Sequence, residues 1–226
     1  MSEVSRVTRT KETARISYNK MSRWYDLLAG GSEKKYQDIG LRMLNLQPGE
    51  TVLEIGFGTG KAALCLARSV GEMGKIFGLD ISEGMLSVAL ERLRKAALAD
   101  RVELRCGDAA SLSYPDEFFD AVFISFTLEL FDTPEIPLVL KECQRVLRRG
   151  GRLCVVAMSK LGKANLMTRL YNWGHQNVQS YVDCRPIYAQ EALEEAGFII
   201  GEAKVMSMWG LPVEVILAAS PEGMGK

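Results

Sequence analysis

From residue 51 onward, the chain alternates short apolar runs with longer segments in which apolar residues recur every three or four positions. Short runs rich in β-branched and aromatic residues are typical of buried parallel strands, and the longer pattern is typical of helices that pack against them. The alternation therefore predicts a parallel sheet with helices on both faces. The predicted strands comprise residues 51–55, 75–80, 102–106, 121–126 and 152–157.

Two of the helical segments carry signals for their ends. Ser82 is a predicted N-cap, with Glu83 in the first turn of the helix that follows. A second helix is predicted to close with Arg148 and Arg149 at its negative end and with Gly150-Gly151 as its stop. The apolar stripes of the two helices are Met85, Ala89, Leu93 and Ala96 in the first, and Ile136, Val139, Leu140, Cys143 and Leu147 in the second.

The end of the chain departs from this rhythm. Residues 203–208 and 213–219 form two predicted strands that are separated only by residues 209–212. So short a link permits only antiparallel pairing. We therefore expect an α/β fold with three α/β/α layers: a doubly wound, mostly parallel, seven-stranded sheet with a C-terminal antiparallel edge hairpin. Residues 10–47 are predicted to form helices across the mouth of the site.

The length of 226 residues is enough for one full hydrophobic core, so we predict a single domain, residues 1–226. Within it we expect a helical lid over residues 1–49 and a cofactor-binding core over residues 50–158. Residues 159–190 are predicted to be an insertion that forms the substrate pocket. A C-terminal helix and the hairpin complete the domain over residues 191–226.

The composition excludes several classes of protein. The 28 basic and 28 acidic side chains cancel, so the chain lacks the field that drives nucleic-acid binding. Its five cysteines are widely spaced without a C-x-x-C pair, which argues against a disulfide framework and a zinc site. We expect no metal site. The cysteines are typical of reduced core thiols, so we expect a cytoplasmic protein, and no apolar stretch is long enough to cross a bilayer.

The N-terminus is basic: the first 23 residues hold six basic and two acidic side chains and lead into Trp24 and Tyr25. A basic segment beside aromatic residues can rest on an anionic membrane. A solvated arm leading into a helix explains the same pattern, so weak peripheral membrane contact stays an alternative. The sequence leaves the subunit number open between a monomer and a homodimer.

A glycine-rich turn follows the first strand, with Gly56, Gly58 and Gly60 at every second position. Such glycines permit positive φ and a close approach of a ligand to the backbone, and the next helix points its amides at that ligand. The dinucleotide fingerprint needs Gly or Ala at position 61, where this chain has Lys61. Glu54 at the strand end would repel a pyrophosphate and attract a cation.

Two further acids follow the neighbouring strands. Asp80 ends the second strand, where a carboxylate can accept both hydroxyls of a ribose. Asp108 follows the third strand, where it can accept from an exocyclic amino group such as that of adenine. Asp80 alone fits NAD and S-adenosylmethionine equally. The three acids around a glycine turn best fit a sulfonium nucleoside amino acid, which is S-adenosyl-L-methionine.

With these motifs, the chain resembles the class I S-adenosylmethionine-dependent methyltransferases, and the resemblance implies their Rossmann-like fold. Residues 18–26 before the core are similar to the N-terminal helix of the ubiquinone/menaquinone biosynthesis methyltransferases. In those enzymes an aromatic–aspartate pair equivalent to Tyr25-Asp26 helps to close over the methionine end of the cofactor. Residues 27–35 depart from those enzymes, because they lack the Asn-Asp and His-Arg elements. The matching core segments are residues 54–60, 79–82, 106–109, 119–125 and 146–151.

The resemblance implies roles for individual residues. The three glycines surround the methionine moiety, and Asp80 holds the ribose. Ile81 and Met85 lie against the adenine, and Ser125 forms the wall nearest the methyl group. The full set implied for cofactor binding is Tyr25, Glu54, Gly56, Gly58, Gly60, Asp80, Ile81, Met85, Gly107, Asp108, Ala109 and Ser125.

His175 is the only histidine, and it lies with Tyr171 in the predicted insertion. Insertions at the carboxyl edge of such sheets commonly line substrate pockets. His175 can accept a proton from the acceptor as the methyl group arrives, and Tyr171 is a second catalytic candidate. An exposed or satisfied loop histidine and a packing tyrosine explain the same pattern without catalysis. The catalytic residue therefore stays open.

Methyl transfer from a sulfonium is an in-line displacement, so alignment and exclusion of water carry most of the catalysis and a base is optional. We expect methyl transfer from S-adenosyl-L-methionine to a small hydrophobic or aromatic acceptor, with S-adenosyl-L-homocysteine as the product. Two alternatives remain. One is a nicotinamide-dependent oxidoreductase on a related fold, and the other is a non-catalytic regulator that binds the cofactor or its product.

Overall fold

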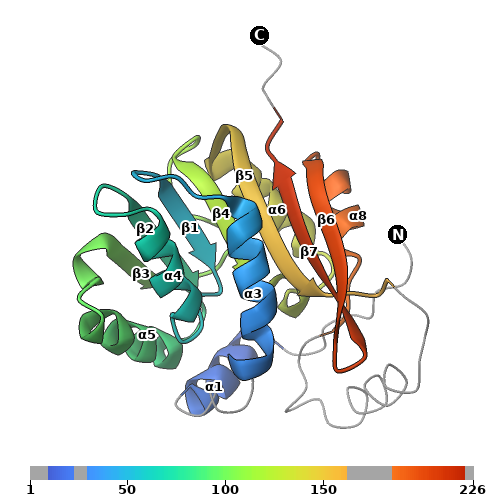
Figure 1. Ribbon diagram of the computed structural model, residues 1–226. Helices are drawn as coiled ribbons and strands as arrows, with labels where there is room; N and C mark the ends of the chain where they lie inside the picture. The colour runs from blue at the N-terminus through green and yellow to red at the C-terminus, as the bar shows by residue number, and fades with distance from the viewer. Residues whose placement is uncertain (1–9, 23–29, 162–184, 222–226) are drawn as a thin grey trace.

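The structure, a computed structural model, describes residues 10–22, 30–161 and 185–221. A seven-stranded sheet in the order β3-β2-β1-β4-β5-β7-β6 lies at its centre (Figure 1). Strands β1 to β5 are parallel, whereas β7 runs antiparallel to both β5 and β6. The expected doubly wound sheet with an antiparallel edge hairpin is confirmed. The strands are β1 (Thr51–Ile55), β2 (Lys75–Asp80), β3 (Val102–Cys106), β4 (Phe119–Ser125), β5 (Leu147–Met158), β6 (Ile199–Met208) and β7 (Leu211–Ala219).

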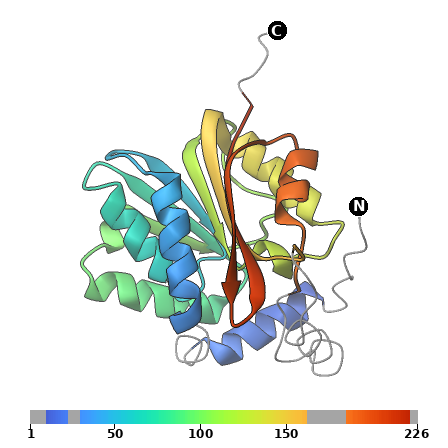
Figure 2. The ribbon, with the colours of Figure 1, turned by 45° about the vertical axis from the view of Figure 1, so that its right-hand side comes forward.

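Each face of the sheet carries its own layer of helices (Figures 1 and 2). Phe123 belongs to the core beneath α3, α4 and α5, and its neighbour Ile124 belongs to the core beneath α6 and α8. Because alternate side chains enter opposite cores, the strands are apolar along their whole length. The helices are α3 (Gly30–Leu44), α4 (Lys61–Ser69), α5 (Glu83–Lys95), α6 (Ile136–Val146) and α8 (Ala189–Glu195).

The two N-terminal helices differ in position. Helix α1 (Lys11–Met21) lies beyond the carboxyl ends of the parallel strands, as expected for a helix across the mouth of a site (Figure 1). The body of α3 lies along the sheet instead. A Cβ at Gly40 would come 2.9 Å from a methyl group of Val156 and 3.1 Å from the ring of Phe123. Glycine therefore lets α3 pack closely on the sheet, and only its first turns reach the mouth.

The predicted end of the helix before β5 is wrong. Helix α6 ends at Val146, and Leu147 already pairs with Phe119 in the sheet. The side chain of Arg148 bonds to Asp120, and Arg149 Nε donates to Glu117 at 3.1 Å. These arginines therefore extend β5 and hold it to the start of β4, rather than closing a helix.

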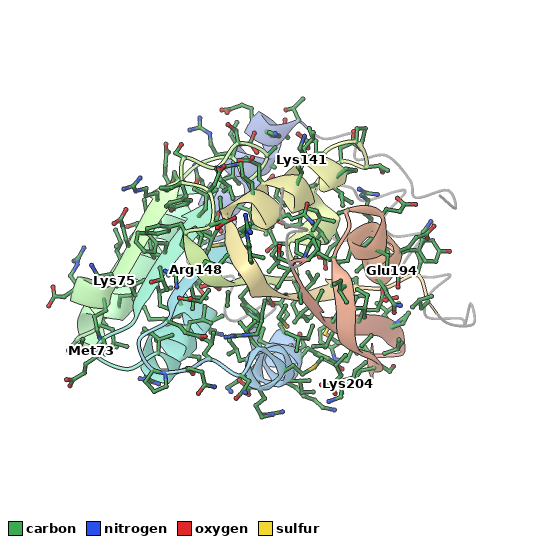
Figure 3. The ribbon with its side chains drawn as sticks, turned by 90° about the horizontal axis from the view of Figure 1, so that it is seen from above. Met73, Lys75, Lys141, Arg148, Glu194 and Lys204 are labelled. Atoms are coloured by element: carbon green, nitrogen blue, oxygen red, sulfur yellow. The ribbon has the colours of Figure 1, made fainter. Side chains whose placement is uncertain are left out.

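The hairpin turn is tighter than the sequence suggested. Trp209 and Gly210 have φ of 52° and 82°, the two positive values that a two-residue type I′ turn requires. The strands therefore meet at Met208 and Leu211, and the predicted four-residue link reduces to two residues. Seen from the amino ends of the parallel strands, Lys141 and Glu194 lie on the outer face of the layer formed by α6 and α8 (Figure 3). Within the described ranges, no helix is both long and apolar enough to cross a membrane.

Candidate functional site

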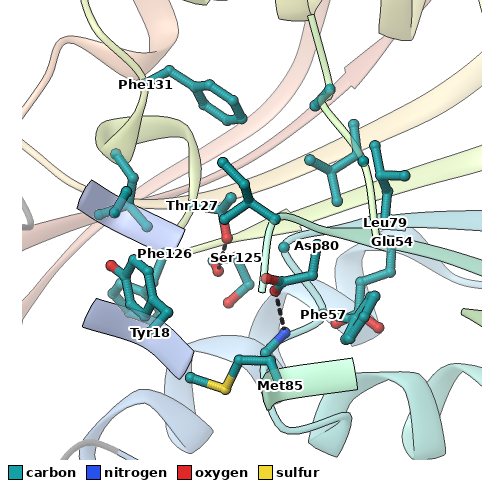
Figure 4. Close-up of a pocket in the computed structure, with 18 of the residues that line it drawn as sticks. Tyr18, Glu54, Phe57, Leu79, Asp80, Met85, Ser125, Phe126, Thr127 and Phe131 are labelled. Atoms are coloured by element: carbon teal, nitrogen blue, oxygen red, sulfur yellow. Dashed lines mark hydrogen bonds between the residues drawn. The ribbon is translucent and has the colours of Figure 1, made fainter. Parts of the chain in front are cut away.

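A pocket lies at the carboxyl ends of β1, β2, β3 and β4 (Figure 4). The turns that follow these strands form its floor, and Lys11, Ala14 and Tyr18 of α1 contribute one wall. The fold thus brings together most of the residues that the sequence placed in separate motifs. Those that line the pocket are Glu54, Gly56, Gly58, Asp80, Ile81, Met85, Gly107, Asp108, Ala109 and Ser125.

Gly60 lies next to this lining and has a packing role. It has a φ of 78° and is the N-cap of α4. A Cβ there would come 2.8 Å from the Cβ of Ala89 on α5. The last glycine of the turn therefore allows α4 and α5 to approach one another, whereas Gly56 and Gly58 face the pocket.

Asp80 ties the first two turns together. Its carboxylate accepts the Gly58 N–H and the Ser82 N–H, each at 2.9 Å. Burial raises the pKa of Asp80 above its ordinary value, and these N–H donors oppose that shift by stabilising the charged form. Because a carboxylate has about four acceptor positions, Asp80 retains capacity for hydroxyl donors of a ligand.

Glu54 is a buried acid directly under the glycine turn. Only 2% of the residue is exposed, and its Oε2 has no hydrogen-bond partner among the described residues. Burial raises its pKa to about 8, and the nearby charge of Asp80 adds to the shift. A positive charge placed beside Glu54 would favour its ionised form. The pocket therefore contains a carboxyl group that suits a cationic ligand.

Asp108 has a partner from α1. Lys11 Nζ lies 2.5 Å from its Oδ2 and 2.6 Å from Oε1 of Glu135. Partial burial raises the pKa of Asp108, but the bonds from Lys11 and from the Ala110 N–H outweigh it and hold the pKa below its ordinary value. The carboxylate that the sequence assigns to an adenine amino group is thus shared with a lysine, at 42% side-chain exposure.

The turn after β4 forms the opposite wall. Phe126 has a φ of 50°, an uncommon conformation for an aromatic residue that is concentrated at functional sites. Thr127 donates from Oγ1 to the Ser125 carbonyl at 2.9 Å and lies against Gly56, where a Cβ would come 2.1 Å from that hydroxyl. The Ser125 hydroxyl is buried and has no partner in the described part of the chain.

Residues 2–182 match the ubiE/COQ5 methyltransferase family. The chain belongs to this family. It is 36% identical over 135 residues to the 2-phytyl-1,4-naphtoquinone methyltransferase of Synechococcus elongatus, covering 60% of this chain and 57% of the relative. It is 32% identical over 158 residues to the ubiquinone/menaquinone biosynthesis C-methyltransferase UbiE of Vibrio vulnificus, covering 70% of this chain and 59% of the relative. The chain thus spans less than two thirds of the length of these relatives.

Solved structures share the fold of this ubiE/COQ5 family member. The [4+2]-cyclase SpnF superposes with a TM-score of 0.76 at 22% identity, covering 96% of this chain and 98% of that one. A SAM dependent methyltransferase from Aquifex aeolicus gives a TM-score of 0.62 at 24% identity, covering 81% and 89% of the two chains. At these identities the likeness establishes the Rossmann-like fold alone.

Sequence reasoning missed two buried ionisable residues beside the pocket of this family member. Glu129 is fully buried, its Oε1 accepts the Met158 N–H at 3.0 Å, and burial raises its pKa to about 8. Arg185, with 1% exposure, donates to the Phe131 carbonyl at 2.5 Å and to Thr133 Oγ1 at 3.1 Å. The only sequence signal was an acid inside the apolar run 128–131, which has no recognisable motif.

Three of the sequence-based candidates lie outside the described residues: Tyr25, Tyr171 and His175. In the ranges that the structure describes, no group of three or more His, Cys, Asp and Glu side chains is placed to hold a metal ion. Among the described residues, the side of the pocket opposite the glycine turn is lined by the turn after β4, by α1 and by the first turns of α3.

Proposed function

We propose that this ubiE/COQ5 family member transfers a methyl group from S-adenosyl-L-methionine to a small hydrophobic acceptor with a quinone-type ring. The observation that carries the proposal is the pair of acids at the glycine turn. Asp80 is preorganised by two N–H donors, and the buried carboxyl group of Glu54 has one oxygen, Oε2, without a hydrogen-bond partner among the described residues. A ribose and a cation are the ligand groups that such a pair suits.

The residues present fit this cofactor. No atom lies within 4 Å of a Cβ built on Gly58, so a ligand can lie directly on its backbone. Asp80 would accept the two ribose hydroxyls, and Ile81 and Met85 would flank the adenine. Glu54 would face the positive charges of the methionine end. The bound cofactor supplies a methyl group on an activated, positively charged sulfur.

The work left to the protein is alignment. Phe126, Leu130 and Phe131 give the acceptor side of the pocket an apolar, aromatic wall. Glu33 and Gln37, one helical turn apart on α3, bring polar groups to the same pocket and would orient ring oxygens of an acceptor. Such a wall excludes water and holds a flat ring in line with the methyl group. The names of the relatives support a quinone as that ring.

The remaining expectations belong to this proposal. One domain would be divided into the lid, core, insertion and C-terminal hairpin given above. Tyr25 would close over the methionine end, and His175 or Tyr171 would serve as an optional base. The protein would work in the cytoplasm as a monomer or homodimer, with at most weak peripheral membrane contact. Family membership favours methyl transfer over nicotinamide chemistry, and the assay of methyl transfer below separates an enzyme from a non-catalytic regulator.

Calorimetry with S-adenosyl-L-methionine tests the cofactor. We expect micromolar binding that falls at least about 100-fold in Asp80→Ala, because two hydrogen bonds to a charged group are lost. Asp100→Ala, an exposed acid outside the pocket, is the matched control. Absence of binding to the wild-type protein, or tight binding of NADH, contradicts the proposal.

Transfer is tested separately with methyl-labelled cofactor and reduced 1,4-naphthoquinones, in which the ring carbon is nucleophilic. Label in the extracted quinone supports the proposed acceptor. Tight binding of the cofactor without transfer to quinones or to a metabolite extract favours the non-catalytic regulator.

A further inference from the structure

Helix α1 crosses the first turn of α5 with almost no space between their backbones. A Cβ at Gly84 would come 2.9 Å from the Asn19 Cα and 2.9 Å from the Ser22 hydroxyl oxygen. Gly84 does not have a positive φ, so its helical conformation is open to any residue. The glycine is therefore explained by the close crossing of α1 rather than by the shape of α5.

The side chain of Asn19 joins the two helices at this crossing. Its Oδ1 accepts the Ser82 hydroxyl at 2.7 Å and the Gly84 N–H at 2.9 Å. Ser82 is fully buried, and its oxygen in turn accepts the Met85 N–H at 3.1 Å as the N-cap of α5. The helix N-terminus is thus capped twice, once by its own serine and once by a residue from α1.

The same serine leads to the pocket. The Ser82 N–H donates to Oδ1 of Asp80, and the Gly58 N–H donates to Oδ2. A serine hydroxyl has one proton, and here it goes to Asn19 rather than to the neighbouring carboxylate. A continuous set of hydrogen bonds therefore runs from α1 through Ser82 to Asp80 and the glycine turn.

The docked helix also forms part of the pocket itself. Tyr18, the residue before Asn19, lines the pocket and packs with Phe57 and Met85. Figure 4 shows its ring among the side chains that line the pocket. Ala14 and Lys11 line the same pocket one and two turns earlier in the helix. Displacement of α1 would therefore remove a wall of the pocket and the acceptor for the Ser82 hydroxyl together.

We propose that Asn19 is a positioning residue for the cofactor, acting with Gly84 as a joint that couples the docking of α1 to the carboxylate of Asp80. The inference rests on the proposed function, since its readout is S-adenosyl-L-methionine binding. Occupancy of the pocket and docking of α1 then stabilise each other. Cofactor should slow hydrogen exchange in the amides of α1 as well as in the glycine turn.

Gly84→Ala in the full chain is the sharpest test. Alanine has a higher helix propensity than glycine, but its methyl group would clash with the backbone of α1. We expect at least a tenfold loss of affinity for S-adenosyl-L-methionine and loss of the cofactor-dependent protection of α1. Gly31→Ala is the matched control, because nothing lies within 4 Å of a Cβ there. Its affinity should stay within threefold of wild type.

Asn19→Leu and Asn19→Asp decide the outcome if Gly84→Ala folds poorly. The leucine variant loses the acceptor and should bind cofactor at least fivefold more weakly, whereas aspartate keeps both acceptor positions and should restore binding. If the leucine variant or a folded Gly84→Ala variant binds like wild type and still protects α1, the inference is overturned. If wild type itself fails to bind cofactor, the proposed function fails instead.

Discussion

The two halves of the pocket are built by different means. On the proposed cofactor side, the turns after β1 and β2 are held by backbone N–H groups that converge on Asp80. On the proposed acceptor side, the turn after β4 contains Phe126 at positive φ, and a buried guanidinium from Arg185 holds the loop that follows it. The first half depends on local turn geometry, and the second depends on partners distant in the sequence.

This difference teaches where variation in the pocket is permitted. The half formed by backbone turns should tolerate few substitutions, because the spacing of its glycines and the helix ends determine its shape. A half held by side chains from other segments can change its shape when those side chains change. The two halves touch where Thr127 meets Gly56, so the most severe substitutions should be those at that contact.

Gly56→Ala should have the largest effect. Its Cβ would come 2.1 Å from the Thr127 hydroxyl oxygen at a φ of 75°, so we expect a loss of about 3 kcal/mol or more in the free energy of unfolding. Gly58→Ala, at a φ of 50° with open space around its Cβ, should lose only about 1 kcal/mol but should weaken cofactor binding. Urea denaturation and calorimetry on both variants check this. If the two variants are equally stable, the two halves of the pocket are not closely packed at Gly56 and Thr127.

Arg185→Met comes next. It leaves the Phe131 carbonyl and the Thr133 hydroxyl without their donor, so we expect a loss of about 3 kcal/mol in stability. Cofactor affinity should stay within about threefold, because Arg185 is not among the described residues that line the pocket. Arg149→Met, an exposed arginine paired with Glu117, should cost less than about 1 kcal/mol. A large loss of cofactor affinity in Arg185→Met would show that the halves are coupled.

The pH dependence of stability separates two kinds of glutamate. The pKa of Glu129 is about 8 in the folded protein, above its unfolded value, so the folded state binds more protons between about pH 4.5 and 8. The contribution of Glu129 to the free energy of unfolding is fully present at low pH. It falls by about 1.4 kcal/mol per pH unit as the pH rises through this window. Glu129→Gln keeps an acceptor for the Met158 N–H and should remove that slope.

Glu142 should affect the pH dependence of stability in the opposite direction, and Glu142→Gln tests this. The hydrogen bond from Arg145 lowers the pKa of Glu142, so its contribution is present at neutral pH and is lost as the pH falls through its folded value. Unfolding curves recorded from pH 4 to 9 compare both variants with wild type. If the free energy of unfolding depends on pH in the same way in Glu129→Gln and in wild type, Glu129 is ionised in the folded protein.

Lys11→Met should have the smallest effect. Lys11 shares the Asp108 carboxylate that we propose for the adenine amino group, and its charge would oppose a cationic ligand. The variant should therefore bind S-adenosyl-L-methionine about threefold more tightly, with a smaller response to added salt. Lys95→Met, which removes an exposed pair with Glu91, serves as the control. Weaker binding in Lys11→Met would instead make Lys11 a clamp that holds α1 over the ligand.

The same division explains what could be predicted from the sequence. The bounds of β1, β2 and β3 and the Ser82 cap are confirmed, because apolar runs and turn residues act locally. The helix expected through Leu147 was wrong because pairing with Phe119 overrides local helical periodicity. Asn19 lies in the recognised segment 18–26 but had no predicted role, and Glu129 and Arg185 carried no motif. Their partners lie far along the chain, and only the fold brings them together.

The contact between Gly56 and Thr127 also affects the order in which the pocket can form during folding. The glycine turn is made early during synthesis, but the residue that packs on it follows a strand placed far later in the chain. Pairing of such distant strands is slow, because a long loop must close before the contact forms. A nascent chain can therefore hold the complete glycine motif and still lack the surface that shapes it. The cofactor can bind only after β4 has paired with β1. Ligand binding should therefore stabilise the finished sheet rather than speed its assembly.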